Sequence, residues 1–330
     1  MEMVVYAFRQ LAAFLSGRTH HVPPPRTWMV EVTNRCNLSC PMCPRESVSF
    51  ATQDMDLAFI KKLLDDNPGL ESIWPYGYGE SFLHPDLFEI IRYAKTKRIV
   101  VSLSTNGTLL TTDNTKRLIE SGLDYMILAI DGATAATYER YRYGARFERV
   151  VANVERLLAL KNHSRTEMHV TVQMIRMEGN EAEIDQFRRM WKRKGVDCVR
   201  VRQDLTRKPA GLPSHFRGAH RPCFFLWRGP AFIQAAGTLL PCPYYHGSEP
   251  FGDLRSQSMA EAWNSEKMVR LRDAHLRGDL TEFPVCAGCP RYQPNAALAS
   301  ASFFATTDNI RRWLPLIEDI QRRTAVTIVE

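Results

Sequence analysis

The run Arg35-Cys36-Asn37-Leu38-Ser39-Cys40-Pro41-Met42-Cys43 brings three cysteines together at the spacing C-x3-C-x2-C. A closed structural zinc site uses four protein ligands, and its cysteines usually begin with C-x2-4-C. An iron–sulfur cubane is normally held by four thiolates. Three closely spaced thiolates therefore indicate a cubane whose fourth iron is open to another ligand. The alternative is structural zinc or a chance group of buried cysteines.

Composition sets the limits on what the chain can be. Its 330 residues are enough for two domains, or for one large barrel with an appendage. The net charge is +7, but no run of five or six like charges marks a nucleic-acid partner. No stretch reaches the roughly 18 apolar residues of a membrane span. Eight cysteines, grouped as three and four with one left over, favour metal binding in a reducing cytoplasm over a disulfide framework.

Short apolar runs alternate with helical patterns along the first two thirds of the chain. The predicted strands cover residues 28–33, 72–76, 100–105, 125–131, 168–174 and 198–202. Helical patterns lie between them at residues 57–66, 85–97, 112–121, 147–161 and 181–194. Alternating β and α elements give right-handed crossovers and a parallel sheet. The fold class is therefore α/β, a partial (β/α)6 TIM-like barrel over residues 26–205 with its active site at the carboxyl strand ends, where the cysteine loop lies.

A separate segment precedes the barrel. Residues 1–16 have an amphipathic helical pattern, which ends before Pro23-Pro24-Pro25. The basic start and the small-residue cleavage site of a signal peptide are missing. We expect residues 1–25 to be an N-terminal amphipathic helix and extension that lies on the barrel rather than on a membrane.

Several predicted strands alternate polar and apolar residues, although a buried parallel strand is usually apolar throughout. The polar face of the fifth strand carries His169 and Gln173, and that of the sixth carries Arg200 and Arg202. With a period of two, this face should line the lumen while the apolar face packs under the helices. A polar lumen suits a hydrophilic substrate. Alternatively, the two arginines pair with lumen carboxylates such as Glu31.

Two short motifs follow the second and third strands. In Tyr76-Gly77-Tyr78-Gly79-Glu80, small residues would let the backbone approach a ligand, and Glu80 could receive a charged ammonium group. Ser104-Thr105-Asn106-Gly107 ends the third strand, and Asp131 closes the fourth. Each motif by itself could be an ordinary turn, since Asn-Gly is a strong turn signal.

The cysteine loop and these motifs, in this order, resemble the radical S-adenosylmethionine (radical SAM) superfamily over roughly residues 26–205. The resemblance implies that Cys36, Cys40 and Cys43 hold a [4Fe–4S] cluster whose open iron binds the amino and carboxylate groups of S-adenosylmethionine. It further implies that the reduced cluster and S-adenosylmethionine yield a 5′-deoxyadenosyl radical, which takes a hydrogen atom from substrate carbon. The protein positions the target and excludes side reactions.

The resemblance also implies contacts to S-adenosylmethionine. The Gly-Glu segment would contact the amino group, and the Ser-Asn segment would contact the ribose and carboxylate. Tyr78 stands where many members of the family have a smaller residue. The cofactor-binding residues implied in this way are Gly77, Gly79, Glu80, Ser104, Asn106 and Asp131.

A second cysteine group follows the barrel and consists of Cys223, Cys242, Cys286 and Cys289. Four cysteines ending in C-x2-C can hold zinc or an iron–sulfur cluster, and spacing does not separate the two. A hairpin turning at Gly237 is predicted to lead into Cys242.

This hairpin, the run Phe251-Gly-Asp-Leu254 and a helix at residues 260–263 resemble the C-terminal extension called SPASM, or its shortened form called twitch. A full SPASM extension has seven or more cysteines for two clusters. The resemblance therefore implies a small cysteine-rich α+β twitch domain over residues 206–297. Its four thiolates would hold one auxiliary [4Fe–4S] cluster that transfers electrons or shapes the pocket.

Two features remain outside these motifs. Cys198 on the sixth strand is interpreted as a small core residue, with a lumen thiol that donates a hydrogen atom as the alternative. Residues 298–330 have helical apolar spacing and are expected to form a C-terminal helix that packs on the barrel.

The polar lumen and the single auxiliary cluster favour oxidation of a secondary alcohol of a sugar or aminocyclitol, with the auxiliary cluster as electron acceptor. The candidate catalytic residues, which would accept a proton or orient the hydroxyl, are Arg200, Arg202, His169 and Gln173. Arginine, with a pKa above about 12, suits binding of a carboxylate or phosphate better than service as a base.

Other outcomes compete with oxidation. Redox-neutral epimerisation, or decarboxylation of a sugar or sugar nucleotide, is the first alternative. Peptide modification ranks lower, because only about 25 residues precede the barrel. A non-enzymatic iron–sulfur or zinc protein would explain the cysteines but not the ordered motifs. The expected partners are a small polar substrate and an external reductant such as flavodoxin or ferredoxin, in the cytoplasm, without nucleic acid.

Overall fold

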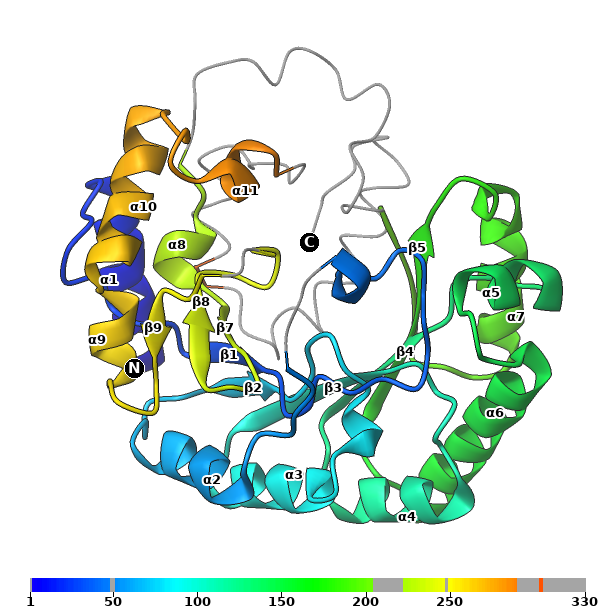
Figure 1. Cartoon of the computed structure of the whole chain (residues 1–330). Helices are drawn as coiled ribbons and strands as arrows, with labels where there is room; N and C mark the ends of the chain where they lie inside the picture. Colours follow the sequence, from blue (N-terminus) through cyan, green and yellow to red (C-terminus); the bar gives the residue numbers. More distant parts are fainter. Residues whose placement is uncertain (1, 48–50, 204–221, 247–248, 290–302, 305–330) are drawn as a thin grey trace.

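A nine-stranded sheet organises the molecule, in the order β6-β5-β4-β3-β2-β1-β7-β8-β9 (Figure 1). The computed structural model describes residues 2–47, 51–203, 222–246, 249–289 and 303–304. The first seven strands in sequence run parallel, and β8 and β9 are antiparallel to their neighbours. The strands are β1 (Thr27–Val30), β2 (Ser72–Trp74), β3 (Val100–Thr105), β4 (Tyr125–Ala129), β5 (His169–Arg176), β6 (Cys198–Gln203), β7 (Ala231–Ile233), β8 (Thr238–Leu240) and β9 (Gly252–Asp253).

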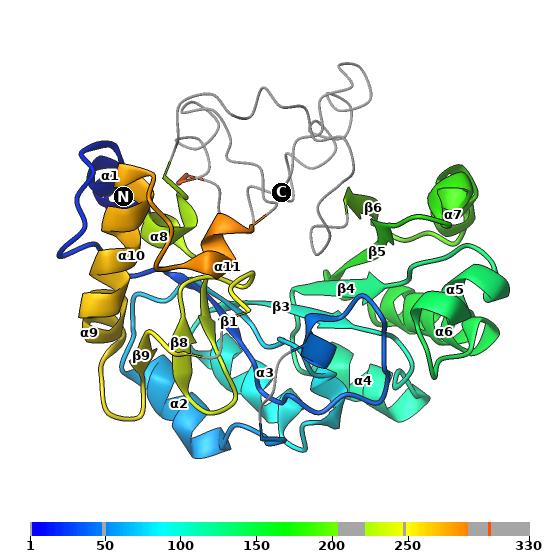
Figure 2. The same ribbon diagram turned by 45° about the horizontal axis from the view of Figure 1, so that its top comes forward.

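Helices follow the first five strands and cover the outer face of the sheet (Figures 1 and 2). They are α2 (Leu57–Asp65), α3 (Leu87–Thr96), α4 (Thr112–Glu120), α5 (Ala135–Tyr141), α6 (Phe147–Ser164) and α7 (Ile184–Arg193). Side-chain caps fix where three of them begin: Asp56 accepts from Phe59 N, Thr111 from Asn114 N, and Thr134 from Thr137 N. The predicted partial barrel of six parallel strands is confirmed.

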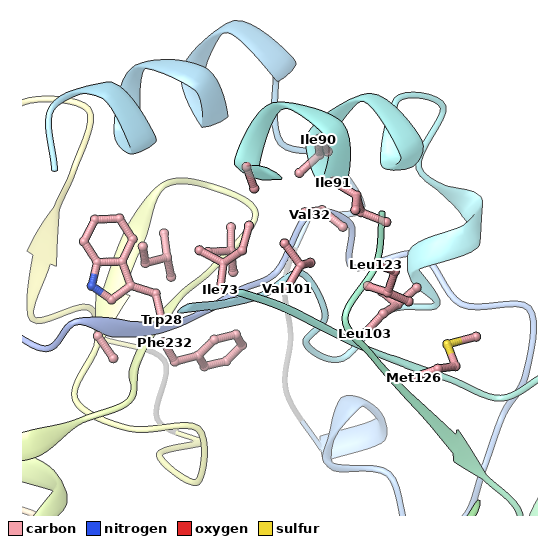
Figure 3. Packing of buried hydrophobic residues seen from close by; sticks show 14 of the residues in the cluster. Trp28, Val32, Ile73, Ile90, Ile91, Val101, Leu103, Leu123, Met126 and Phe232 are labelled. Atoms are coloured by element: carbon pink, nitrogen blue, oxygen red, sulfur yellow. The ribbon is translucent and has the colours of Figure 1, made fainter. Parts of the chain in front are cut away.

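The main core lies between the sheet and these helices. Ile73, Val101 and Leu103 from the strands meet Ile90 and Ile91 of α3, and all five are at most 1% exposed (Figure 3). The opposite face of the sheet lines the lumen. The predicted alternation is therefore present, with the apolar face packed under the helices.

The predicted hairpin after the barrel joins the same sheet, because β7 pairs in parallel with β1 through Trp28↔Ala231. Gly237 makes its turn with a φ of +91°, a left-handed conformation that favours glycine. Around the hairpin lie α8 (Phe225–Arg228), α9 (Met259–Trp263), α10 (Glu266–Arg277) and α11 (Pro284–Ala287).

The N-terminal helix α1 (Glu2–Leu15) packs on this second region rather than on the barrel helices. The ring of Phe14 meets that of Trp227 at 5.4 Å, and Trp227 Nε1 donates to the carbonyl of Arg18 at 2.7 Å. The helix also touches the start of the barrel, because the ring of Tyr6 lies 3.7 Å from the guanidinium of Arg26. Within the described residues, no helix combines the length and apolar character needed to cross a membrane. The C-terminal helix expected at residues 298–330 lies outside the described residues, apart from Phe303 and Phe304.

Candidate active site

The cysteine loop (residues 34–43) leaves the carboxyl end of the β1 segment and leads into the short helix η1 (Pro44–Ser47). Arg35 anchors the start of the loop. Its Nη2 donates to Asp54 Oδ2 at 2.6 Å and to the carbonyl of Leu83 at 2.6 Å. The loop is thus held by one charged and one backbone contact from different parts of the barrel, which fixes it at the carboxyl ends of the strands.

The three thiols of this loop perturb one another. Burial is the main cause that raises the pKa of Cys36, Cys40 and Cys43, and each thiol also feels a neighbouring thiol of the three. Within the described residues, no three His, Cys, Asp or Glu side chains lie close enough to hold a single metal ion. The donor set itself, three thiols on one anchored loop, fits an iron–sulfur cluster with one open iron.

Arg142 places a buried positive charge beside this loop. Its Nη1 lies 3.9 Å from Cys40 Sγ, and its Nη2 and Nε donate to Asp131 Oδ2 at 2.6 and 2.7 Å. Asp131 is also fixed by the backbone N–H of Ile175, which donates to Oδ1 at 2.7 Å. Both carboxylate oxygens therefore already have donors, and any contact of Asp131 with S-adenosylmethionine would be shared with Arg142.

The two motif glycines are required by packing within the protein. A Cβ on Gly79 would lie 2.2 Å from the carbonyl oxygen of Thr33, and one on Gly77 would lie 2.7 Å from Glu31 Cβ. The expectation that small residues admit a ligand is therefore incomplete. The glycines let the motif lie directly on the end of the β1 segment, at the base of the cysteine loop.

Glu80 connects the motif that follows β2 with the carboxyl end of β3. It is 3% exposed, and it accepts from Thr105 Oγ1 and from Asn106 N, both at 2.8 Å. Burial is the main cause that raises its pKa. Asn106 in turn donates from Nδ2 to Asn37 Oδ1 of the cysteine loop at 3.0 Å. Glu80 and Asn106 thus lie beside the loop as expected, and both carry internal hydrogen bonds that hold it.

Ser104 points from the lumen face of β3 and is half-buried. In register it pairs with Ile127 of β4, which pairs with Thr171 of β5 and then with Cys198 of β6. Because registered residues of parallel strands share a face, Cys198 points into the lumen rather than under the helices. The interpretation of Cys198 as a core residue is therefore less consistent with the structure than the lumen-thiol alternative.

The catalytic candidates on β5 and β6 lie at different depths. Gln173 is registered with Arg200, and Arg202 lies two residues further toward the carboxyl end. His169 is the first residue of β5, four residues before Gln173, and its ring lies 5.9 Å from that of Tyr125. At about 3.3 Å per residue, this places His169 roughly 13 Å along the strand from Gln173. His169 therefore lies at the opposite end of the lumen from the cysteine loop.

Arg202 reaches the second cysteine region. Its Nη2 donates to Tyr244 Oη at 3.1 Å, so a residue of the loop after β8 touches the far edge strand of the barrel. Tyr76, which follows β2, lies near the same group. Burial and then Tyr244 raise its pKa to about 12, and the charges of Arg202 and Arg200 oppose that rise. These four side chains, Tyr76, Arg200, Arg202 and Tyr244, gather at one place in the lumen.

The four cysteines of the second group converge from three separate segments. Burial and the neighbouring Cys223 raise the pKa of Cys242, which also feels Cys286 and Cys289. Burial, Cys223 and Cys289 raise the pKa of Cys286 to about 12. Because a cluster binds thiolates, loading this site must release protons from the thiols. These four cysteines form a complete donor set for a cluster.

Tyr78 lies between the two cysteine groups. Burial is the main cause that raises its pKa, followed by the charges of Glu31, Cys242 and Cys43. Its hydroxyl and Nδ1 of His246 share a hydrogen bond of 2.8 Å. Its ring packs edge-on against Phe232 of β7 at 5.5 Å. Tyr78 is thus fixed by the second region while it belongs to the barrel motif.

Sequence reasoning missed Arg142, Tyr244 and His246. Tyr244 and His246 follow Cys242 directly in the run Cys242-Pro-Tyr-Tyr-His246, and this proximity was the available signal. Arg142 carried no signal, because a helix-end arginine is ordinary until the fold brings it to Asp131. Glu31, considered as a partner of the lumen arginines, instead accepts from the backbone N–H of Tyr78 at 2.9 Å and of Ala235 at 3.2 Å.

Comparison with known proteins gives the class of this site. Residues 30–189 match the sequence profile of the radical SAM superfamily, and residues 223–290 match the SPASM profile, an iron–sulfur cluster-binding domain. The chain is an enzyme that uses S-adenosylmethionine with one [4Fe–4S] cluster in the barrel and carries an auxiliary iron–sulfur domain. It belongs to the radical SAM superfamily with a C-terminal SPASM/twitch-type domain.

Its relatives carry different activities. The tungsten-containing aldehyde ferredoxin oxidoreductase cofactor-modifying protein of Pyrococcus furiosus is 26% identical over 335 residues, covering 86% of this chain and 90% of that protein. The PqqA peptide cyclase of Xanthomonas euvesicatoria is 24% identical over 341 residues, covering 89% of each. The crystal structure of BtrN in complex with AdoMet and 2-DOIA is 20% identical with a TM-score of 0.54, covering 82% of this chain and 94% of that one. The last likeness concerns the fold alone.

Proposed function

We propose that this enzyme oxidises a secondary alcohol of a small polar substrate, a sugar or an aminocyclitol, to the ketone. One observation carries the proposal. The hydroxyl of Tyr244, two residues after Cys242, accepts a hydrogen bond from Arg202 Nη2 in the lumen, so the auxiliary centre is next to the substrate-facing wall. An electron acceptor beside the substrate is what an oxidation needs and what a redox-neutral reaction does not need.

The residues of the lumen have separate roles in this proposal. Arg200 and Arg202 bind an anionic or hydroxyl-rich part of the substrate, because a guanidinium stays charged and presents several donors. Gln173, registered with Arg200, orients a hydroxyl from the neighbouring strand. Tyr76 and Tyr244 narrow the same space with half-buried rings, which helps to exclude water. His169, at the other end of β5, supports the lumen floor and is not part of the catalytic group.

The cofactor-facing residues serve the other side of the site. Cys36, Cys40 and Cys43 hold the first cluster, while Gly77, Gly79, Glu80, Ser104 and Asn106 lie beside S-adenosylmethionine. Arg142 offsets the negative charge that three thiolates bring into a buried site. When bound, S-adenosylmethionine and the two clusters supply removal of the carbinol hydrogen atom and an acceptor for the remaining electron.

The setting follows from the thiol chemistry. Seven cysteines in two ligand groups require reducing conditions, so we place the protein in the cytoplasm with a flavodoxin or ferredoxin as the external reductant. Cys223, Cys242, Cys286 and Cys289 fill the coordination of the auxiliary cluster, which leaves it free for electron transfer and not for direct binding of substrate.

The test is an anaerobic assay of the reconstituted chain with S-adenosylmethionine, a reductant and a panel of aminocyclitols, sugars and nucleotide sugars. We expect a product that lacks two hydrogen atoms, formed with one 5′-deoxyadenosine per turnover. With deuterium on the carbinol carbon, the label should appear in 5′-deoxyadenosine. A product of unchanged composition, or one that has lost carbon dioxide, would contradict the oxidation.

Peptide modification is the competing function, because curated relatives over most of the chain include peptide cyclases. The discriminating assay offers the same enzyme a peptide library in place of the small-molecule panel. Turnover of peptides alone, with no oxidised sugar or aminocyclitol, would replace the proposed function.

A further inference from the structure

A hydrogen bond of 2.8 Å between Tyr78 Oη and His246 Nδ1 joins the motif after β2 to the loop that follows Cys242. Tyr78 feels the charges of Cys43 and Cys242, so its side chain lies between the two centres. His246 is half-buried, and its ring packs against that of Tyr78 at 5.8 Å between centroids. Neither Tyr78 nor His246 is among the catalytic residues predicted from the sequence.

We propose that His246, through the hydroxyl of Tyr78, accepts the proton that accompanies one-electron reduction of the auxiliary centre. The inference rests on the proposed alcohol oxidation for its purpose, since that reaction releases a proton and an electron from the same C–OH group. Placing the two acceptors side by side limits the separation of charge in a buried site. Neither Arg200 nor Arg202 can serve in this way, because arginine is already protonated.

The bonds and electrons balance as follows. The C–H bond of the carbinol breaks, and its hydrogen atom goes to the radical supplied by S-adenosylmethionine. The O–H bond breaks, and its proton goes to Tyr78 Oη while the phenolic proton of Tyr78 moves to His246 Nδ1. The carbonyl π bond forms, and the remaining electron goes to the auxiliary cluster. The products are the ketone, 5′-deoxyadenosine, a protonated His246 and a reduced cluster.

The surroundings of His246 suit a neutral acceptor. Burial lowers the pKa of His246 below its ordinary value, which favours the neutral ring. Among the described residues, the titratable group that contacts it is Tyr78, which itself feels the charges of Glu31, Cys242 and Cys43. With the ring proton on Nε2, Nδ1 accepts from the Tyr78 hydroxyl and is the atom that would gain a proton. A negative charge arriving on the auxiliary centre favours that protonation.

The experiment needs no substrate. The reconstituted holoenzyme is titrated anaerobically with a chemical reductant at a series of pH values, and the auxiliary centre is followed by electron paramagnetic resonance. Addition of S-adenosylmethionine identifies the signal of the first centre. We expect the equilibrium constant for reducing the auxiliary centre to fall tenfold per pH unit, one proton per electron, above the pKa of His246 in the oxidised protein.

Two variants and a control complete the test. His246→Gln should abolish this pH dependence, whereas His163→Gln on the exposed surface of α6 should preserve it. Tyr78→Phe keeps the ring on Phe232 and removes the acceptor of protonated His246, so the sloping range should move to lower pH. A flat titration of the unaltered enzyme would overturn the proposal even if a variant failed to hold its cluster. A slope that survives His246→Gln would overturn it too. Failure to find an oxidised product would instead count against the proposed function and leave this titration unaffected.

Discussion

The two cysteine groups are built in different ways. The first lies on eight consecutive residues, 36–43. Hydrogen bonds of this loop and of the preceding Arg35 join it to the segments that follow β2 and β3 and to the end of α5. The second draws its thiols from residues 223 to 289 and depends on the pairing of β7 with β1 to bring them near the lumen. A local loop can therefore be rebuilt around one cluster, whereas the second site exists only when the whole sheet has formed.

Removing one thiol from each group should separate their functions most strongly. Cys43→Ala should lower cleavage of S-adenosylmethionine by about a thousandfold or more, because the remaining ligands act as a unit. Cys242→Ala should leave that cleavage within a few-fold and abolish formation of the oxidised product. Each variant should hold about four iron atoms per chain rather than about eight. The measurements are the amounts of 5′-deoxyadenosine, oxidised product and iron in each variant. An equal loss of S-adenosylmethionine cleavage in both variants would contradict the separate roles of the two cysteine groups.

Breaking the Asp131–Arg142 ion pair beside the first cysteine group should have the next largest effect. Asp131→Asn leaves Arg142 buried without its charged partner, and breaking such a pair costs about 4 kcal/mol. The two side chains are 1% and 12% exposed, so solvent screens the pair little. We expect a lower melting temperature and weaker binding of S-adenosylmethionine. The matched control is Asp185→Asn in α7, whose pair with Arg188 is exposed and should be worth less than about 1 kcal/mol. Similar losses in both variants would show that burial is not the cause.

Several features of the fold and of the two cysteine sites were predictable from the sequence. The six parallel strands, their helices and the loop cysteines followed from periodicity and short-range spacing, which are properties of neighbouring residues. The lumen face of Arg200 and Arg202 followed from a period of two. The depth of His169 was predictable as well, because it lies four residues before Gln173 on one predicted strand. The roles of Tyr244 and His246 were not predictable, because their contacts join residues far apart in the chain.

The motif glycines show how local sequence and tertiary contact combine. Gly79→Ala places a Cβ 2.2 Å from the carbonyl oxygen of Thr33, a backbone atom that cannot move aside cheaply. We expect a loss of about 3 kcal/mol and displacement of the cysteine loop. The measurements are the melting temperature and the iron content of the first group. Gly69→Ala is the control, because its Cβ would meet only the side chain of Arg26 at 3.7 Å. Normal loading of the first cluster in Gly79→Ala would contradict the packing role.

Glu31 is hydrogen-bonded to both the barrel and the hairpin of β7 and β8. Its substitution should have the smallest effect on stability of the changes considered. Its carboxylate accepts from Tyr78 of the barrel motif and from Ala235 of the auxiliary hairpin, and burial raises its pKa to about 6. Because the folded protein favours the protonated form, this stabilisation is fully present below the ordinary pKa of about 4.3 and is lost as pH rises through about 6. The whole loss is about 2 kcal/mol, of which about 1 kcal/mol falls between pH 5 and pH 8.

Glu31→Gln removes the titration while it keeps the shape of the side chain. The stability of the unaltered protein, measured relative to this variant, should therefore fall by about 1 kcal/mol from pH 5 to pH 8. Using the change with pH cancels the fixed cost of turning one acceptor oxygen into an amide. Melting temperatures of both proteins across this range provide the measurement. A difference that stays constant with pH would mean that Glu31 is already ionised in the folded protein at pH 5, and that the two regions are joined by an ordinary carboxylate.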